Sequence, residues 1–111
     1  MIASRPSVYI YVREPDQRIL REICAGIEEE GVFYEVTVHT AGDIDTLAWN
    51  AAEDSMLGSG IGMIESACAF QIRGLKKGEN VDFFSRPTKE EARRIGTNSA
   101  RAVKKQAFKG I

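Results

Sequence analysis

The sequence predicts one α/β domain over residues 1–111, with a mostly parallel sheet of four to five strands flanked by about three helices in three layers. The length of 111 residues is that of a single domain that builds its own core without disulfides or metals. Short β-branched and aromatic runs alternate with amphipathic stretches in the first half. Strands that alternate with helices pair in parallel through right-handed crossovers. The second half is less regular and leaves room for antiparallel strands.

The first predicted strand, residues 8–12, is a β-branched and aromatic run that Pro15 follows closely. Asp16 is placed to cap a helix that reaches to about residue 30, because five apolar residues recur there at helical spacing. These residues are Ile19, Leu20, Ile23, Cys24 and Ile27. Gly31 then stands where a residue in the left-handed conformation ends many helices.

The middle of the chain predicts a second strand and helix and then three short strands. Residues 33–38 form the second strand, and Asp43 caps a helix that ends near residue 56. Glycines around residue 58 turn the chain into the next element. The three strands that follow are predicted at residues 61–64, 67–72 and 81–85.

The last helix has the clearest start signal in the chain. Thr88 and Glu91 form a capping box, in which each side chain accepts a hydrogen bond from the other residue's backbone amide. The helix is predicted from residue 89 to about residue 105. Gly96 interrupts it at a cost of about 1 kcal/mol relative to alanine. The glycine is tolerable there if another backbone approaches it closely.

Acidic and basic residues are unevenly distributed, although the net charge is only −1. Residues 14–65 carry twelve acids and two bases, whereas residues 66–111 carry eleven bases and four acids. Two interpretations remain open. In the first, the acidic and the basic residues lie on separate solvent-exposed faces that meet in the folded domain. In the second, they form a surface shaped for a charged partner.

Several function classes are disfavoured by the sequence. The glycines at 58, 60 and 62 do not fit a nucleotide loop, because Met63 takes the last glycine position and a strand follows where a helix is needed. The single histidine, His39, lies at a strand end, and Cys24 and Cys68 are expected to pack in the core. The acidic segment opposes nucleic acid binding, and the longest N-terminal apolar run is too short for a membrane span. We therefore expect a cytoplasmic protein with both thiols reduced.

Three consecutive acids, Glu28, Glu29 and Glu30, stand at the C-terminal end of the first predicted helix. The helix dipole places negative partial charge at that end and disfavours carboxylates there. The acids are either a solvated face or a contact for a metal ion or a cationic partner group. Mg²⁺ and Ca²⁺ prefer carboxylate oxygens, but the remaining ligands would have to come from elsewhere.

Three stretches resemble the small subunit of the diol/glycerol dehydratase reactivase, the reactivating factor of coenzyme B12-dependent dehydratases. They are ICAGIEEEGV at residues 23–32, GIGM at residues 60–63 and RIGTNSARAVK at residues 94–104. Their order and spacing cover nearly the whole chain. The last stretch is the most specific, because glycine and asparagine are unusual inside a long helix. Phe33, Ser99 and Ala107 depart from the residues usual in the family.

The resemblance implies a non-catalytic subunit that partners a large ATPase subunit, which binds ATP and ADP. It also implies a fold similar to the medium subunit of the dehydratase. This likeness would let the reactivase capture the inactivated dehydratase by subunit exchange and release damaged cobalamin. Glu29 would complete a Mg²⁺ or Ca²⁺ site on the large subunit, with Glu28 as the neighbouring candidate, and the isolated chain would hold no cofactor. The expected location is the cytoplasm, and the sequence leaves open whether the chain is housed in a bacterial microcompartment there.

Two rival interpretations remain: a medium-subunit-like piece of the dehydratase itself, and an unrelated small α/β protein-binding module. The client, a glycerol or a propane-1,2-diol dehydratase, stays open. Without its large subunit, the chain is expected to expose an apolar surface around Met56, Met63 and residues 58–62 and to form a homodimer through it.

Overall fold

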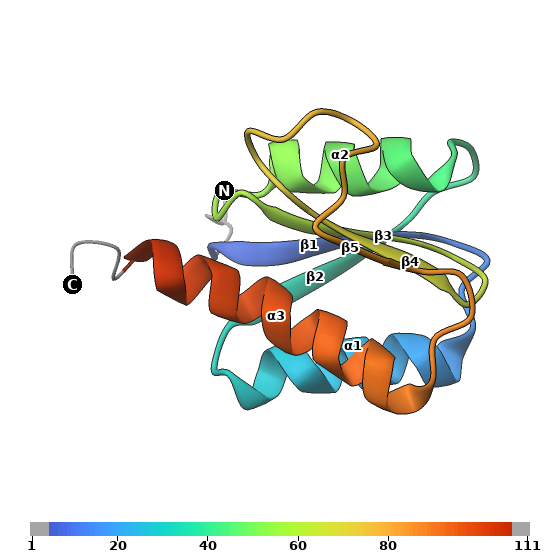
Figure 1. Cartoon of the computed structure of the whole chain (residues 1–111), viewed down its shortest axis with the longest axis horizontal. Helices are drawn as coiled ribbons and strands as arrows, with labels where there is room; N and C mark the ends of the chain where they lie inside the picture. The colour runs from blue at the N-terminus through green and yellow to red at the C-terminus, as the bar shows by residue number, and fades with distance from the viewer. Residues whose placement is uncertain (1–4, 108–111) are drawn as a thin grey trace.

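The computed structural model describes residues 5–107 as a three-layer α/β domain (Figure 1). The elements in chain order are β1 (Ser7–Arg13), α1 (Gln17–Glu29), β2 (Phe33–Val38), α2 (Ile44–Asp54), β3 (Ser59–Ile64), β4 (Ala67–Ile72), β5 (Asp82–Phe84) and α3 (Lys89–Ala107). The predicted fold class is confirmed. None of the helices in this part of the chain combines the length and the apolar character needed to cross a membrane.

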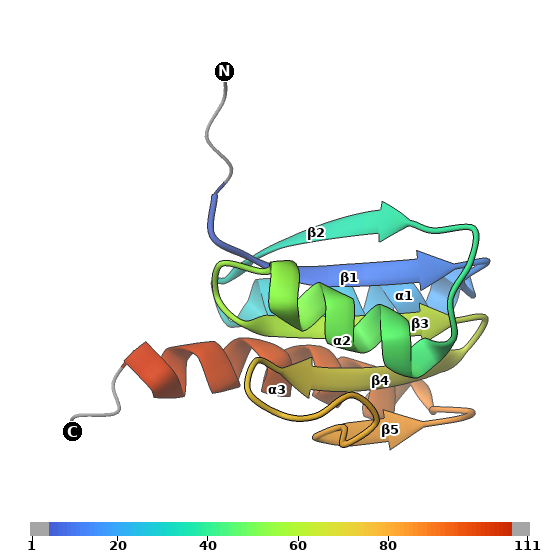
Figure 2. The same ribbon diagram turned by 90° about the horizontal axis from the view of Figure 1, so that it is seen from above.

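The five strands form one mixed sheet in the order β2-β1-β3-β4-β5. β1 pairs in parallel with β2 and β3, and β4 and β5 add antiparallel strands on the far side of β3. Helices α1 and α3 cover one face of the sheet and α2 covers the other (Figures 1 and 2). β2 and β5 are therefore the two edges, and neither helix layer extends fully over β2 (Figure 2).

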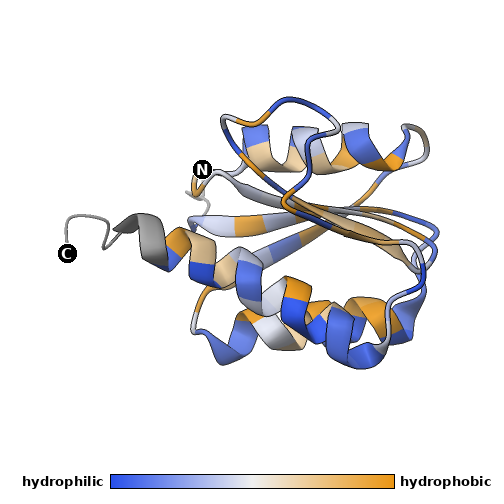
Figure 3. Ribbon diagram, viewed as in Figure 1, coloured by the Kyte–Doolittle hydropathy of each residue, from blue (hydrophilic) through white to orange (hydrophobic). Residues whose placement is uncertain are grey.

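The main core lies between the sheet and the helix pair α1 and α3. It includes Val8, Ile10 and Val12 of β1 together with the apolar stripe of α1, as the helical spacing predicted. A smaller cluster under α2 contains Tyr11, Leu47 and Ala51. Hydropathy colouring shows the same division, with apolar inner faces and polar outer faces on the helices (Figure 3). β1 is consequently covered on both faces.

The expected helix starts are confirmed by their capping contacts. The carboxylate of Asp16 accepts hydrogen bonds from the amides of Arg18 and Ile19, and Asp43 accepts one from Thr46. Thr88 and Glu91 form the reciprocal capping box, with distances of 2.9 and 3.0 Å. These local contacts place each helix on the sheet in a fixed orientation.

Two glycines allow α1 and α3 to cross at close range. A Cβ atom on Gly96 would overlap the carbonyl oxygen of Ile23 in α1, and one on Gly26 would overlap the Arg93 carbonyl in α3. The condition under which Gly96 is tolerable inside a helix is therefore met, because the backbone of α1 passes close to it. The close crossing holds the charged end of α1 alongside the middle of α3.

The structure corrects the sequence interpretation around β3. This strand begins at Ser59 instead of residue 61, so Gly60 and Gly62 lie inside it, packed against the backbone of α2. Met63 is fully buried, because both faces of β3 are covered by helices. The expected apolar dimer surface around Met63 and residues 58–62 is therefore wrong. Met56, which is 56% exposed, is the one residue of that set whose side chain lies largely in solvent.

Candidate functional site

The candidate site is the seam where the acidic end of α1 meets the basic face of α3. Arg93 Nη1 lies 2.8 Å from Glu29 Oε2. Arg101 Nε lies 3.2 Å from Glu30 Oε2, and Lys104 Nζ lies 2.8 Å from Glu30 Oε1. The acids of one predicted half of the chain thus pair with bases of the other half.

Glu30 explains how an acid is tolerated at the end of α1. The Lys104 ammonium donates to the Glu30 carbonyl oxygen at 3.2 Å as well as to its carboxylate. One cation therefore neutralises both the side chain and an orphan carbonyl of the helix end. The hydrogen bond from Lys104 holds the pKa of Glu30 below its usual value, and Arg101 adds to this effect.

The three acids differ in how much of the side chain remains available. Among the side chains that the structure describes, Glu30 is only 15% exposed and is held by two cations, whereas Glu29 is 59% exposed and has one ion pair. Glu28 is exposed, and no ion pair to it is present in the described part of the chain. Glu28 and Glu29 are thus the carboxylates that a partner can reach.

Arg93 is shared between two carboxylates of α1. Its Nη2 lies 2.9 Å from Glu22 Oε1, and its Nη1 reaches Glu29. The hydrogen bond with Glu22 is the largest cause that raises the pKa of Arg93. Because Glu22 holds the guanidinium from the other side, Arg93 keeps an ion-pair partner when Glu29 turns away from it.

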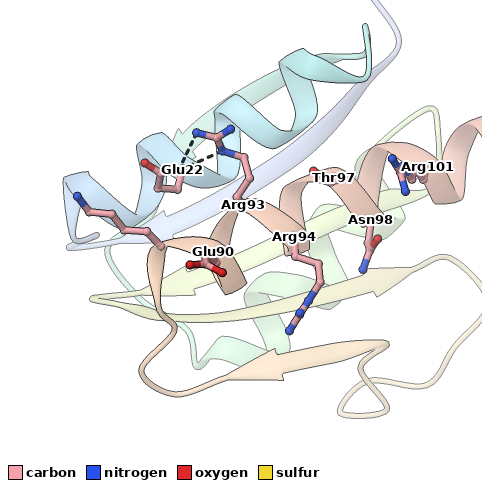
Figure 4. A pocket seen from close by; sticks show the side chains of 8 residues that line it. Glu22, Glu90, Arg93, Arg94, Thr97, Asn98 and Arg101 are labelled. Carbon is pink, nitrogen blue, oxygen red and sulfur yellow. Dashed lines mark hydrogen bonds and ion pairs between the residues drawn. The ribbon is translucent and has the colours of Figure 1, made fainter.

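A shallow hollow of about 590 Å³ runs along α3 next to this seam (Figure 4). It is lined by Glu22, Lys89, Glu90, Arg93, Arg94, Thr97, Asn98 and Arg101. Four of the eight residues are bases, and the Arg94 guanidinium lies 5.8 Å from the Phe84 ring centre. Sequence reasoning singled out residues 94–104 as a motif but missed this lining. The spacing of Glu90, Arg94, Asn98 and Arg101 by three or four residues is the signal that indicates a common helix face.

The remaining titratable candidates are structural. Cys24 and Cys68 are buried, as expected, and desolvation raises the pKa of Cys24 and raises that of Cys68 to about 12. The His39 ring lies 4.4 Å from that of Tyr11, just after β2. Among residues 5–107, no three His, Cys, Asp or Glu residues are arranged to hold a metal ion. A metal bound at Glu29 would need ligands from a partner.

Fold and charge distribution define a small three-layer α/β protein in which acids of α1 pair with bases of α3. The chain belongs to the dehydratase medium subunit family, which matches residues 5–109. It is 31% identical over 109 residues to the propanediol dehydratase-reactivating factor small subunit of Salmonella typhimurium, covering 97% of this chain and 94% of the relative. It is 30% identical over 109 residues to the diol dehydratase-reactivating factor small subunit of Klebsiella michiganensis, covering 97% and 87%.

Solved structures agree with these sequence matches. The diol dehydratase-reactivating factor complexed with ADP and Mg²⁺ superposes with a TM-score of 0.84 at 30% identity, covering 91% of this chain and 94% of that chain. A glycerol dehydratase reactivase has the same TM-score at 25% identity, covering 90% and 93%. The resemblance to the reactivase small subunit is thereby confirmed. The alternative of an unrelated α/β module is wrong.

Proposed function

We propose that this chain is the non-catalytic small subunit of a dehydratase-reactivating factor. One observation carries the proposal: a chain of the dehydratase medium subunit family has whole-length relatives that are named reactivating-factor small subunits. One fold thus serves both a dehydratase subunit and a reactivase subunit. Two chains of the same fold can compete for one docking surface, which is the requirement for subunit exchange.

In this mechanism, the chain stays bound to a large ATPase subunit until an inactivated dehydratase binds that subunit. The large subunit then binds the dehydratase in place of this chain, and damaged cobalamin leaves. ATP binding and hydrolysis on the large subunit drive the cycle. The role of the small chain is to cover and release a surface, and the charged seam of α1 and α3 suits it, because charged surfaces favour fast and reversible association.

The test is reconstitution with the large reactivase subunit and inactivated dehydratase holoenzyme, with ATP and Mg²⁺. We expect cobalamin release and recovered dehydratase activity to require this chain, and the labelled chain to leave the large subunit as the dehydratase binds. Equal recovery without this chain would refute the proposal.

A second candidate, a subunit of the dehydratase itself, is favoured by the name of the matching family. The same reagents separate the two candidates. If the chain restores activity to a dehydratase lacking its medium subunit, and does not bind the large reactivase subunit, the second candidate replaces the first.

We further propose that Glu29 completes a Mg²⁺ or Ca²⁺ site on the large subunit. Its carboxylate is exposed and, among the side chains that the structure describes, is held only through Oε2, by an arginine that Glu22 also holds. Such a carboxylate can turn toward a metal at little cost. Glu30 fits this role poorly, because Lys104 and Arg101 occupy both of its oxygens. Glu28 is the alternative ligand because it is exposed and adjacent.

Association with the large subunit is measured for the wild type and for Glu29→Gln, with Mg²⁺ and with a chelator. We expect Glu29→Gln to weaken binding at least tenfold in Mg²⁺ and to have little effect in chelator. Glu53→Gln, on the opposite helix layer, is the control for loss of one exposed charge. Equal affinities of wild type and Glu29→Gln in Mg²⁺ would remove Glu29 from the site, and a loss with Glu28→Gln instead would assign the ligand to Glu28.

A further inference from the structure

The edge strand β2 exposes apolar side chains. Within the described residues it pairs only with β1, and it forms one border of the sheet (Figure 2). Val36 and Val38 lie on one face of the sheet and are 39% and 70% exposed. Phe33 lies on the other face, is 51% exposed and has the Arg5 guanidinium 4.3 Å from its ring centre. Exposed edges of this kind are templates for pairing with another strand, and proteins usually protect them with charge, proline or a covering element.

The backbone of β2 determines which residues can pair outward. The amide of His39, directly after β2, donates to the Val12 carbonyl of β1 at 2.7 Å. Because backbone groups alternate in direction along a strand, the odd-numbered residues of β2 face β1. The amides and carbonyls of Tyr34, Val36 and Val38 therefore point away from the sheet.

We propose that β2 pairs antiparallel with β2 of a second copy of this chain, with Val36 opposite Val36 on the two-fold axis. In this register, Tyr34 faces Val38 of the other copy at both ends. All three pairs consist of outward-pointing residues, so each exchanges two backbone hydrogen bonds. Their side chains form a continuous apolar row on the side of the sheet that α1 and α3 cover.

Both neighbouring registers that keep the faces of the sheet matched are less favourable. A shift in one direction places Glu35 directly opposite Glu35, and like charges opposite each other destabilise a strand pair. This shift also leaves Val38 facing residue 32, which lies outside β2. A shift in the other direction leaves Tyr34 facing residue 40, which also lies outside β2. The proposed register instead places Glu35 opposite the Thr37 hydroxyl, a pair without charge conflict.

The face of α1 next to β2 carries charges that are complementary between the two copies. Gln17, Arg21, Cys24 and Glu28 form one row along the helix. This row faces β2, because Tyr34 packs against the core cluster that contains Cys24, and Glu28 lines a hollow with Tyr34. The two-fold axis at Val36 brings the Arg21 end of one α1 toward the Glu28 end of the other, so opposite charges meet twice.

Self-association is measured by sedimentation across a concentration series for the wild type, Val36→Lys and Met56→Lys. Val36→Lys places two ammonium groups on the axis and should raise the dimer dissociation constant at least tenfold. Met56→Lys changes a residue of comparable exposure away from the edge and should leave the constant unchanged. Circular dichroism verifies that both variants are folded. A wild type that stays monomeric at all concentrations, or a Val36→Lys variant that associates equally well, would overturn the proposal.

Cysteine cross-linking tests the register independently. Paired residues in an antiparallel ladder have Cα atoms about 5.5 Å apart, within the range of a disulfide. We expect Val36→Cys to form a covalent dimer with a mild oxidant, because the native Cys24 and Cys68 are buried. Glu35→Cys should remain monomeric. Cross-linking of Glu35→Cys without cross-linking of Val36→Cys would refute the register.

Discussion

Replacing Gly96 with alanine tests how tightly α1 and α3 are packed. A Cβ atom at this position would overlap the Ile23 carbonyl oxygen and would lie 2.9 Å from the carbonyl carbon. Both are backbone atoms of α1 and cannot rotate away. Gly26 is the reciprocal position, where a Cβ would lie 2.8 Å from the Thr97 amide nitrogen. The substitution must therefore move one helix relative to the other.

Two opposing free-energy terms set the magnitude. Alanine gains about 1 kcal/mol over glycine in a helix interior. Overpacking a core costs about 1–3 kcal/mol, and backbone on the opposing side favours the upper end of that range. The net loss should be about 2 kcal/mol in the free energy of unfolding. For a domain of this size, the melting temperature should fall by about 10 °C.

Urea and thermal unfolding of Gly96→Ala, Gly26→Ala and Glu90→Ala measure this effect. Glu90 is exposed in the first turn of α3, so its replacement is the control and should change the free energy of unfolding by less than about 0.5 kcal/mol. If Gly96→Ala were as stable as the wild type or more stable, helix propensity would outweigh the contact and the close crossing of the helices would be wrong.

Three further predictions concern caps, thiols and ion pairs. Thr88→Ala should lose about 1 kcal/mol in urea unfolding, because the Glu91 amide loses its cap; an unchanged midpoint would contradict this. At pH 8, Cys24 and Cys68 should react with an alkylating reagent only through unfolding. The free energy of unfolding should decrease as the pH rises from about 9 to about 12, because burial raises the pKa of Cys68 to about 12 and the unfolded thiol ionises first. Because Lys104 lowers the pKa of Glu30, the wild type should lose stability as the pH falls below the usual glutamate pKa. Glu30→Gln should lack this part of the pH dependence, and identical acid unfolding curves would refute the ion pair.

Features that depend on neighbouring residues were predicted well from the sequence. The caps at Asp16, Asp43 and Thr88 and the left-handed Gly31 at φ 74° each arise from contacts within a few positions. The apolar stripe of α1 is visible in the sequence as a helical periodicity. The strand at Ala67–Ile72 was also predicted to the residue.

Features that depend on packing between distant elements could not be predicted. Met56 and Met63 are alike in sequence terms, but one follows α2 in solvent and the other lies in a strand with both faces covered. Glycines at 58 and 60 indicated a turn. In the structure, Gly60 lies inside β3, where the absence of a side chain lets the backbone of α2 pack closely against the strand. The exposure of β2 follows from its position at the sheet edge, which is a property of strand order.

The fold explains the uneven distribution of acidic and basic residues along the sequence. The acids at the end of α1 are unfavourable for an isolated helix, because the dipole repels them. The close crossing at Gly26 and Gly96 brings α3 alongside, and its bases at Arg93, Arg101 and Lys104 then pair with acids more than sixty positions away. The pairing satisfies Glu30 almost completely and Glu29 only in part, and it leaves Glu28 in solvent. The same seam therefore stabilises the fold at one acid and keeps its two neighbours available for a partner.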